Sequence, residues 1–191
     1  MGDPIARFRR WVREAARAGA PLPEAMVLAT ADLRGRPSAR SVLLKEANEA
    51  GFVFYTNALS RKGREMAANP WVALVLYWDV TGRQVRVEGK LRELSAQAAD
   101  AYWAERPLGS RLAAAASEQS RPIADRRNLL ARYRQLERSY PSGNVPRPEH
   151  WSGFCVVPST IEFWTRAEPR LHKRELFSRS RGGWKVTILQ P

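Results

Sequence analysis

Three side chains that can hold a phosphate group recur four residues apart in the chain: Tyr102, Arg106 and Ser110. Residues four apart share one face of an α-helix, so Tyr102 and Arg106 would point to the same side. With Lys45 they would supply two cations and two hydroxyl groups, which suffice to hold a phosphate monoester. A solvated polar face near a helix end is the alternative explanation, and the spacing alone leaves it open.

A second candidate anion site lies at the start of a predicted helix. Ser60 is a good N-cap residue, and Arg61 and Lys62 follow it in the first helical turn. A helix N-terminus has unpaired backbone N–H groups and a partial positive charge, so two cations there oppose the helix dipole. A bound anion would remove this conflict. We therefore predict a phosphate site at the start of this helix.

A third group of polar and aromatic side chains lies near the C-terminus and comprises Trp164, Arg170, His172 and Arg174. Taken alone, the run RLHKR that contains the last three is better explained as a basic strand edge. The single cysteine, Cys155, excludes an internal disulfide, and neither it nor the two histidines have the spacing of metal ligands. We therefore predict no metal site and place Cys155 in the core of a strand.

Short strands are the main elements that would position these groups. Two of them, Ser41–Leu44 and Phe52–Thr56, are joined by a polar turn over 46–50 and precede the helix that begins at Ser60. The run 71–78 is the most continuous apolar segment, so we expect it to be the central strand. Apolar or alternating patterns predict further strands at 25–30, 84–89, 153–157 and 161–165, and a hairpin over 175–189.

Helices are predicted between and around these strands, at about 3–18, 60–69, 95–106, 111–116 and 122–140. The last is a long basic helix with five side chains expected to point inward: Ile123, Leu129, Leu130, Tyr133 and Leu136. This order favours a mainly β (α+β) fold, an antiparallel barrel with peripheral helices, over a doubly wound parallel sheet. The absence of a G-x-G-x-x-G segment after a strand, and of a P-loop, argues against a Rossmann site. The 191 residues fit a single domain over 1–191.

The net charge of +13 comes mainly from arginine, which supplies 27 of the 32 basic residues and is spread along the whole chain. Nucleic-acid-binding proteins usually concentrate such charge on one face, and no helix-turn-helix, zinc-finger or aromatic RNA-binding signature is present. Small anionic ligands are therefore the expected partners, rather than nucleic acid. The longest apolar run is far shorter than the ~20 residues of a membrane helix. Because the charged N-terminus is also not signal-like, we expect no membrane segment and a cytoplasmic location.

Taken together, the motifs resemble those of the pyridoxamine 5′-phosphate oxidase family, from about Asp3 to Pro191. The matching pieces are DPIARFRRW, RSVLLK, FVFYTN, SRKGREMAANP, QVRVEGK, the Tyr102/Arg106/Ser110 spacing, EQSR, VPRPEHW, IEFW and RLHKR. Their number and shared order make the resemblance specific. Two departures are visible: Lys173 replaces the acidic residue of the family's usual RLHDR, and ELFSRS follows where an RYxR-like run is expected.

The resemblance implies an antiparallel FMN-binding split β-barrel. It further implies a homodimer with two FMN sites at the subunit interface, and a C-terminal dimerisation and active-site segment at about 146–191. Residues matching the family's FMN phosphate site are Arg40, Arg61 and Lys62, in agreement with the anion site predicted above. The other residues carried over as FMN contacts, some of them from the partner subunit, are Ser41, Val42, Leu43, Leu44, Lys45, Tyr55, Thr56, Gln84, Gln119, Ser120, Trp164 and Arg174.

The same resemblance implies an activity. Pyridoxamine 5′-phosphate or pyridoxine 5′-phosphate would transfer a hydride from C4′ to flavin N5, and O2 would reoxidise the flavin to give hydrogen peroxide. The substrate phosphate would be held by Lys45, Tyr102, Arg106 and Ser110. Arg170 and His172 would lie against the pyridine ring as the candidate catalytic residues.

Two alternatives share this fold. One is an FMN oxidase that acts on another aromatic ring, as in phenazine biosynthesis, but a phosphate clamp would have no use on a substrate without phosphate. The other is a non-catalytic split-barrel protein that binds flavin or haem. The presence of both the flavin set and the substrate set weighs against that second alternative.

Overall fold

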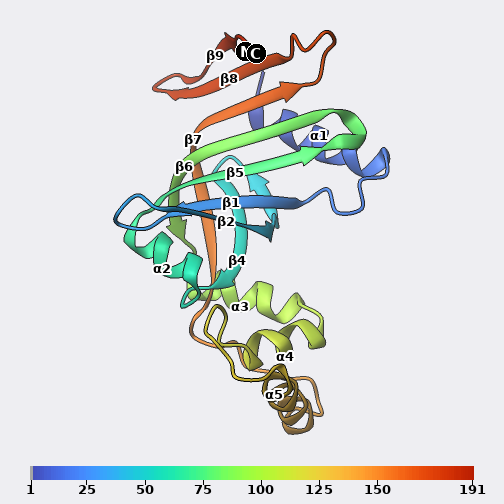
Figure 1. The fold of residues 1–191 in the computed structure, drawn as a ribbon, viewed down its shortest axis with the longest axis vertical. Helices are drawn as coiled ribbons and strands as arrows, with labels where there is room; N and C mark the ends of the chain where they lie inside the picture. Colours follow the sequence, from blue (N-terminus) through green and yellow to red (C-terminus); the bar gives the residue numbers. More distant parts are fainter. Residues whose placement is uncertain (1) are drawn as a thin grey trace.

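Nine strands form one antiparallel sheet that curls into a half-open barrel (Figure 1). The computed structural model describes residues 2–191. The strand order is β2-β1-β5-β6-β7-β4-β3, with β8 paired to β7 and β9 paired to β8. This architecture confirms the predicted antiparallel, mainly β fold. The strands are β1 (Ala25–Ala31), β2 (Pro37–Leu43), β3 (Glu46–Asn48), β4 (Gly51–Asn57), β5 (Trp71–Trp78), β6 (Arg83–Glu93), β7 (Trp151–Thr165), β8 (Lys173–Ser180) and β9 (Gly183–Leu189).

Helices surround the sheet. Figure 1 shows α3, α4 and α5 gathered at one end of the molecule, whereas the β8–β9 hairpin and the C-terminus lie at the other. Among residues 2–191, no helix is long and apolar enough to cross a membrane. The helices are α1 (Pro4–Arg17), α2 (Arg61–Ala68), α3 (Ala96–Glu105), α4 (Leu108–Ala116) and α5 (Arg126–Ser139), with a short 3₁₀ turn, η1 (Asp79–Thr81).

The N-terminal helix α1 packs its apolar face against the barrel. Asp3 caps it by accepting a 2.8 Å hydrogen bond from the Ile5 backbone N–H, and Pro4 occupies the first helical position. Phe8 packs edge-on against Phe52 of β4, with ring centroids 4.9 Å apart. Trp11 likewise packs edge-on against Phe163 of β7, with ring centroids 5.0 Å apart. Both contacts join the helix to strands that are distant in sequence and close one side of the core.

The alternation of side chains along the strands separates a core face from an outer face. Inward residues of β1, β5, β6 and β7 are almost fully buried, namely Met26, Leu28, Leu74, Leu76, Val85, Val87, Ile161 and Phe163. Residues between them point outward, so Val27 and Tyr77 remain 40% and 50% exposed. The predicted central strand, β5, is therefore two-faced rather than buried on both sides, and it lies next to β6, the middle strand of the order.

The longest strand, β7, combines the two strands predicted at 153–157 and 161–165. A bulge lies opposite Gly89, where the register of β6 on β7 shifts by one residue. A Cβ on Gly89 would meet the Val157 carbonyl oxygen at 2.1 Å, so only glycine fits this close approach. The bulge lets Pro158, which has no backbone N–H, remain within a continuous strand.

Two further predictions of local structure were wrong. The expected turn over 46–50 contains the short strand β3, which pairs with β4. The last predicted helix begins at Arg126 rather than at 122, because Asp125 caps it by accepting a 2.7 Å bond from the Arg127 N–H. Consequently Ile123 lies outside the helix and is exposed, and Leu130 is exposed as well, whereas both were expected to point inward.

Candidate active site

A cleft of about 460 Å³ lies between the sheet and the helical end of the molecule. The end of β2, the strand β4, the start of α2, the helices α3 and α4 and the loop after α4 all contribute to it. It contains all four predicted substrate-phosphate ligands and seven other predicted FMN contacts. Its lining residues are Ser41, Val42, Leu43, Lys45, Tyr55, Thr56, Lys62, Tyr102, Arg106, Pro107, Ser110, Gln119 and Trp151.

The Arg106 guanidinium is the clearest sign of a missing ligand in this cleft. It lies over the indole rings of Trp151 and Trp103, with its central carbon 4.7 Å and 5.0 Å from their centroids. Its Nη1 atom is buried and makes no hydrogen bond within the described chain. Burial lowers the pKa of Arg106, because the buried charge is poorly solvated. A phosphate oxygen would satisfy both the charge and the free donor.

A stack of aromatic rings forms the wall beside Arg106. Tyr55 of β4 and Tyr102 of α3 stack with centroids 4.1 Å apart, and Trp151 stacks on Tyr55 at 5.3 Å. The Lys45 ammonium lies 5.7 Å from the Tyr102 centroid. Gly153 makes room for this arrangement, because a Cβ there would approach the Tyr55 ring to 2.6 Å. The stack therefore brings Tyr55 of β4, a predicted FMN contact, and Tyr102 of α3, a predicted substrate ligand, to one wall.

Lys62 is a buried cation at the floor of the cleft, only 7% exposed. Its Nζ atom donates to Ser60 Oγ at 3.0 Å and to Gln119 Oε1 at 2.6 Å, and both partners are neutral. Burial, reinforced by repulsion from nearby Arg40, lowers its pKa to about 8. Ser60 caps α2 as predicted, since its Oγ accepts from the Gly63 N–H at 3.3 Å. A buried ammonium without a carboxylate partner fits the predicted anion site.

The other two predicted FMN phosphate ligands, Arg40 and Arg61, do not line the cleft, and both bind a carboxylate that the sequence interpretation missed. Glu65 Oε2 lies 3.1 Å from Arg40 Nη2, and Glu65 Oε1 lies 2.8 Å from Arg61 Nε. Burial alone would raise the pKa of Glu65, but hydrogen bonds from Ser38, Thr30 and the two arginines hold it at about 2. The spacing of Arg61 and Glu65, four apart on a helix, was the available signal.

A second group of predicted FMN contacts lies across the outer face of the sheet and does not line the cleft. Gln84 of β6 is directly opposite Trp164 of β7, and Trp164 is opposite Arg174 of β8. Arg174 Nε donates to Glu162 Oε1 at 2.8 Å, and this ion pair raises the pKa of Arg174. The row is continuous with Tyr77 of β5, which is opposite Gln84. Strand register therefore brings together three residues that are far apart in sequence.

The two candidate catalytic residues lie in the loop between β7 and β8, close to this second group. The His172 ring centroid is 4.6 Å from that of Trp164, and its Nδ1 accepts a 3.2 Å hydrogen bond from the Ala167 N–H. Nε2 is therefore the ring nitrogen left to face a ligand. Arg170 is exposed and has a φ of 82°, a backbone conformation uncommon for a residue with a side chain.

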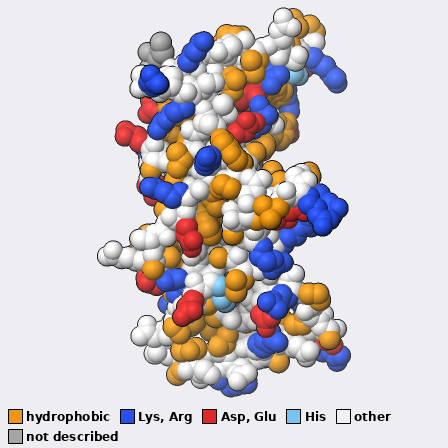
Figure 2. All heavy atoms as spheres, turned by 90° about the vertical axis from the view of Figure 1, so that its left-hand side faces the viewer, with side chains coloured by type: hydrophobic (Ala, Val, Ile, Leu, Met, Phe, Trp, Pro, Cys, Tyr) orange, Lys and Arg blue, Asp and Glu red, His pale blue; other side chains and the backbone are white. Residues whose placement is uncertain are grey.

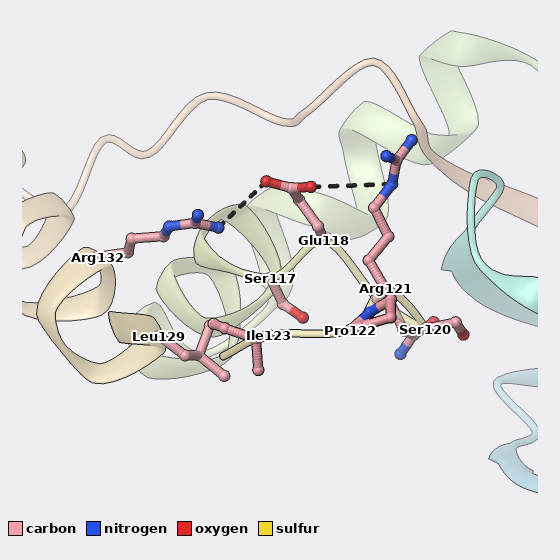
Figure 3. Close-up of a pocket in the computed structure, with 9 residues that line it drawn as sticks. Ser117, Glu118, Ser120, Arg121, Pro122, Ile123, Leu129 and Arg132 are labelled. Atoms are coloured by element: carbon pink, nitrogen blue, oxygen red, sulfur yellow. Dashed lines mark hydrogen bonds and ion pairs between the residues drawn. The ribbon is translucent and has the colours of Figure 1, made fainter. Parts of the chain in front are cut away.

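The loop between α4 and α5 carries two predicted FMN contacts, Gln119 and Ser120. The remaining predicted contact, Leu44, is buried in the hydrophobic core and does not line the cleft. A small cavity of about 180 Å³ lies at the α4–α5 loop. Figure 3 shows its lining residues and the ion pairs from Glu118 to Arg132 and Arg121. Ser120 lines this cavity and has a φ of 72°, whereas Gln119 reaches back to Lys62 in the main cleft. The loop thus joins the helical end of the molecule to the anion site.

Family models match most of the chain. Residues 12–139 match a model described as pyridoxamine 5′-phosphate oxidase. The chain belongs to the pyridoxamine 5′-phosphate oxidase family of enzymes. Residues 151–191 match a second model, described as the pyridoxine 5′-phosphate oxidase C-terminal dimerisation region. The residues Trp164, Arg170, His172 and Arg174 all lie in that second region.

Relatives in this oxidase family align over nearly the whole chain. A pyridoxine/pyridoxamine 5′-phosphate oxidase from Rubrobacter xylanophilus is 54% identical over 189 residues, covering 99% of this chain and 87% of the relative. One from Gluconobacter oxydans is 50% identical, covering 99% and 94%. The resemblance inferred from the sequence motifs is therefore confirmed at the level of the family.

Solved structures confirm the split-barrel fold expected of the family. PhzG from Burkholderia lata 383, in complex with tetrahydrophenazine-1-carboxylic acid, superposes with a TM-score of 0.95 and 34% identity, covering 100% of this chain and 94% of PhzG. A pyridoxamine 5′-phosphate oxidase-related, FMN-binding protein from Nostoc punctiforme superposes with a TM-score of 0.80 and 21% identity, covering 100% of both chains. The second likeness is one of fold.

Proposed function

We propose that the protein is an FMN-dependent oxidase that converts pyridoxamine 5′-phosphate and pyridoxine 5′-phosphate to pyridoxal 5′-phosphate. The observation that carries this proposal is a pair of cations in one cleft that have no carboxylate partner within the described chain. The buried Nη1 of Arg106 lies at one side, and the buried ammonium of Lys62 lies at another. Two cations without carboxylates fit two phosphate groups, one from the cofactor and one from the substrate.

The residues around Lys62 would hold FMN. Lys62, Arg40 and Arg61 would bind its phosphate, while Thr56 and Tyr55 would line the flavin's path along β4. When bound, FMN would supply the hydride acceptor at N5 and the reaction with O2 that yields hydrogen peroxide. The remaining proposed contacts include Gln84, whose side-chain amide can both donate and accept a hydrogen bond.

The substrate would be anchored by its phosphate at the other side of the cleft. Arg106 and Lys45 would neutralise that phosphate, and Tyr102 and Ser110 would donate hydroxyl hydrogen bonds. The substrate phosphate is remote from the reacting carbon, and anchoring it would orient the pyridine ring. This orientation would be the protein's main contribution to the hydride transfer. His172, whose Nδ1 accepts from the Ala167 N–H, would carry its proton on Nε2 and donate it in a hydrogen bond to the substrate.

We propose further that the enzyme is a homodimer with its sites between the subunits. The cleft and the row of Gln84, Trp164 and Arg174 are separate in one chain, so a second chain is needed to complete a site from both groups. The match of residues 151–191 to a dimerisation region supports this arrangement. Figure 2 shows hydrophobic side chains exposed between scattered Lys and Arg on one side of the molecule, as expected of a surface that a partner covers.

The similarity to PhzG gives a second candidate, an oxidase of a phenazine precursor. The cleft chemistry favours the first candidate, because the group of Arg106, Lys45, Tyr102 and Ser110 is suited to a phosphate ester. The relatives at 50–54% identity, named pyridoxine/pyridoxamine 5′-phosphate oxidases, also support it. A non-catalytic flavin-binding or haem-binding protein would need no second phosphate site.

A visible absorption spectrum tests the proposal most directly. The protein reconstituted with FMN is mixed anaerobically with pyridoxine 5′-phosphate, and air is then admitted. We expect the flavin absorbance to bleach with substrate and to return with oxygen. Flavin that remains oxidised with both phosphorylated substrates would favour an oxidase of another substrate, and a protein that does not bind FMN would refute the proposal.

A further inference from the structure

Glu65 links the two arginines that we assign to the FMN phosphate, and it is itself 7% exposed. Its two carboxylate oxygens bind cations from different elements: Arg40 of β2 at 3.1 Å and Arg61 of α2 at 2.8 Å. The carboxylate therefore bridges the barrel wall and the helix whose N-terminus forms the anion site.

Two hydroxyl groups of the β1–β2 hairpin complete this network. Thr30 and Ser38 are directly opposite each other in the strand register, and both donate to Glu65 Oε2. Each hydroxyl also accepts from Arg40, Thr30 Oγ1 from Nη1 at 2.6 Å and Ser38 Oγ from Nη2. Arg40 Nη1 also donates a 3.0 Å hydrogen bond to the Leu28 carbonyl oxygen. The Arg40 guanidinium is thus held by partners on β1, β2 and α2.

The arrangement is not explained by the stability of α2 alone. A glutamate that follows an arginine by four residues is the weaker orientation of a helical ion pair, and Arg61 opposes the helix dipole. An ion pair with one exposed partner contributes little to stability. Burying a carboxylate among four donors is, by contrast, a way to hold those donors in place.

The charge balance of the cluster also fits a phosphate. Arg40, Arg61 and Lys62 carry three positive charges, and Arg40 is close enough to Lys62 to depress its pKa. Glu65 offsets one of the three and leaves two, about the charge of a phosphate monoester at neutral pH. The carboxylate can therefore reduce the repulsion among the cations without cancelling their attraction for an anion.

We infer that Glu65 is a positioning residue of the proposed FMN site, which holds Arg40 and Arg61 beside Lys62 in the geometry that the FMN phosphate requires. This inference rests on the proposed function, since it assumes that FMN is the ligand. Glu65, together with Ser38 and Thr30, would increase the affinity for FMN without touching the cofactor or the substrate.

The test compares FMN with riboflavin, which lacks the phosphate, by quenching of flavin fluorescence in titrations of the purified protein. Glu65→Met keeps the side-chain volume and removes every acceptor, and Glu65→Gln keeps one. We expect the ratio of the riboflavin Kd to the FMN Kd to fall about tenfold in Glu65→Met and by less in Glu65→Gln. A loss of folded protein common to both ligands cancels in this ratio.

Glu175→Met is the matched control, because Glu175 is a similarly shielded carboxylate that pairs with Arg7 at 2.6 Å, outside the anion site. It should leave the ratio unchanged. If Glu65→Met does not fold, Ser38→Ala removes one donor from the same carboxylate and should lower the ratio about threefold. An unchanged ratio in the Glu65 or Ser38 variants would overturn the inference alone, whereas a wild-type protein that binds FMN no better than riboflavin would refute the phosphate site itself.

Discussion

Arg106 is the residue whose chemistry is most specific to the proposed substrate. Its Nη1 is buried without a partner among the described residues, and its guanidinium carbon lies within 5.0 Å of the centroids of two indole rings. Replacing it with alanine removes a charge-assisted contact to the substrate phosphate but leaves Lys62 and its neighbours untouched. We expect Arg106→Ala to raise KM for pyridoxine 5′-phosphate by about a hundredfold, as loss of such a contact typically costs 2–3 kcal/mol.

Steady-state kinetics with FMN in excess would measure this change. The flavin content of the purified variant is the control, because it should equal that of the wild type. A variant that loses FMN would contradict the assignment of Arg106 to the substrate.

The lowered pKa of Lys62 leads us to predict that FMN binding depends on pH. Its pKa is lowered to about 8 in the ligand-free protein, and a phosphate bound beside it would raise that pKa again. Binding therefore takes up a proton above pH 8, and the FMN affinity should fall as the pH rises, by at most about tenfold per unit. Isothermal titration between pH 7 and 9.5 would measure the slope.

The variant Lys62→Met lacks this titrating group, so it should bind FMN more weakly at pH 7 and show a flatter profile. Its stability gives a second check. The folded pKa of Lys62 is below the ordinary 10.5, so the unfolded chain binds more protons between pH 8 and 10.5. The ligand-free wild type should therefore gain stability relative to Lys62→Met as the pH rises through that window.

The sequence was enough to name most residues of the candidate site, but not to predict which of them contact one another. The N-cap at Ser60 was predicted and is confirmed. Tyr102 and Arg106 do meet in the cleft, but the predicted shared helix face was wrong, because α3 ends at Glu105 and Arg106 follows it in extended conformation. Glu65 was not predicted, because its role depends on Thr30 and Ser38 facing it from a hairpin whose register no local pattern specifies. Likewise, no spacing indicates that Lys62 points into the cleft, although the four-residue spacing of Arg61 and Glu65 does indicate their ion pair.

At the scale of elements, α2 must lie against the loop that precedes it for the anion site to form. A Cβ on Gly63 would meet the Ala58 carbonyl oxygen at 2.0 Å, so the helix start is pressed directly on that backbone. Gly63→Ala would push the first turn of α2 outward. We expect it to lower the free energy of unfolding by about 1–3 kcal/mol, as overpacking does, and to weaken FMN binding.

Chemical denaturation and a flavin titration would test this expectation. Gly182→Ala is the matched control, since a Cβ there meets no atom within 4 Å, and it should change neither quantity. Equal free energies of unfolding for the two variants would contradict this expectation, because they would show that α2 can shift without loss of stability.

The order and type of the elements followed closely from periodicity and turn residues, and each error has a specific physical cause. The start of α5 was misplaced because Asp125, which lies inside the predicted range, provides the actual cap. The strand β7 was divided because Pro158 normally ends a strand, and the compensating Gly89 lies on another strand far away in sequence. Errors of this kind arise where one element's geometry depends on a partner that is not local.

At the scale of the whole molecule, the two halves of the proposed site are not united in one chain. Ser41 and Val27 are opposite each other, Val27 is opposite Val75, and Val75 is opposite Arg86. This row runs beside the one containing Gln84 and lies on the same outer face. The face therefore extends from the cleft to the second group of FMN contacts, with an exposed apolar strip between them.

A charge in the middle of that strip should separate the proposed subunits. Val27 is 40% exposed on the outer face of β1, where aspartate can be solvated in a monomer but not beneath a partner chain. We expect Val27→Asp to shift sedimentation velocity profiles from dimer to monomer and to make the melting temperature less dependent on protein concentration. Leu33→Asp, at an 82% exposed turn residue, should remain dimeric. Since the site would need both chains, Val27→Asp should also lose FMN as it dissociates, and a dimeric, FMN-replete Val27→Asp protein would place the subunit interface elsewhere.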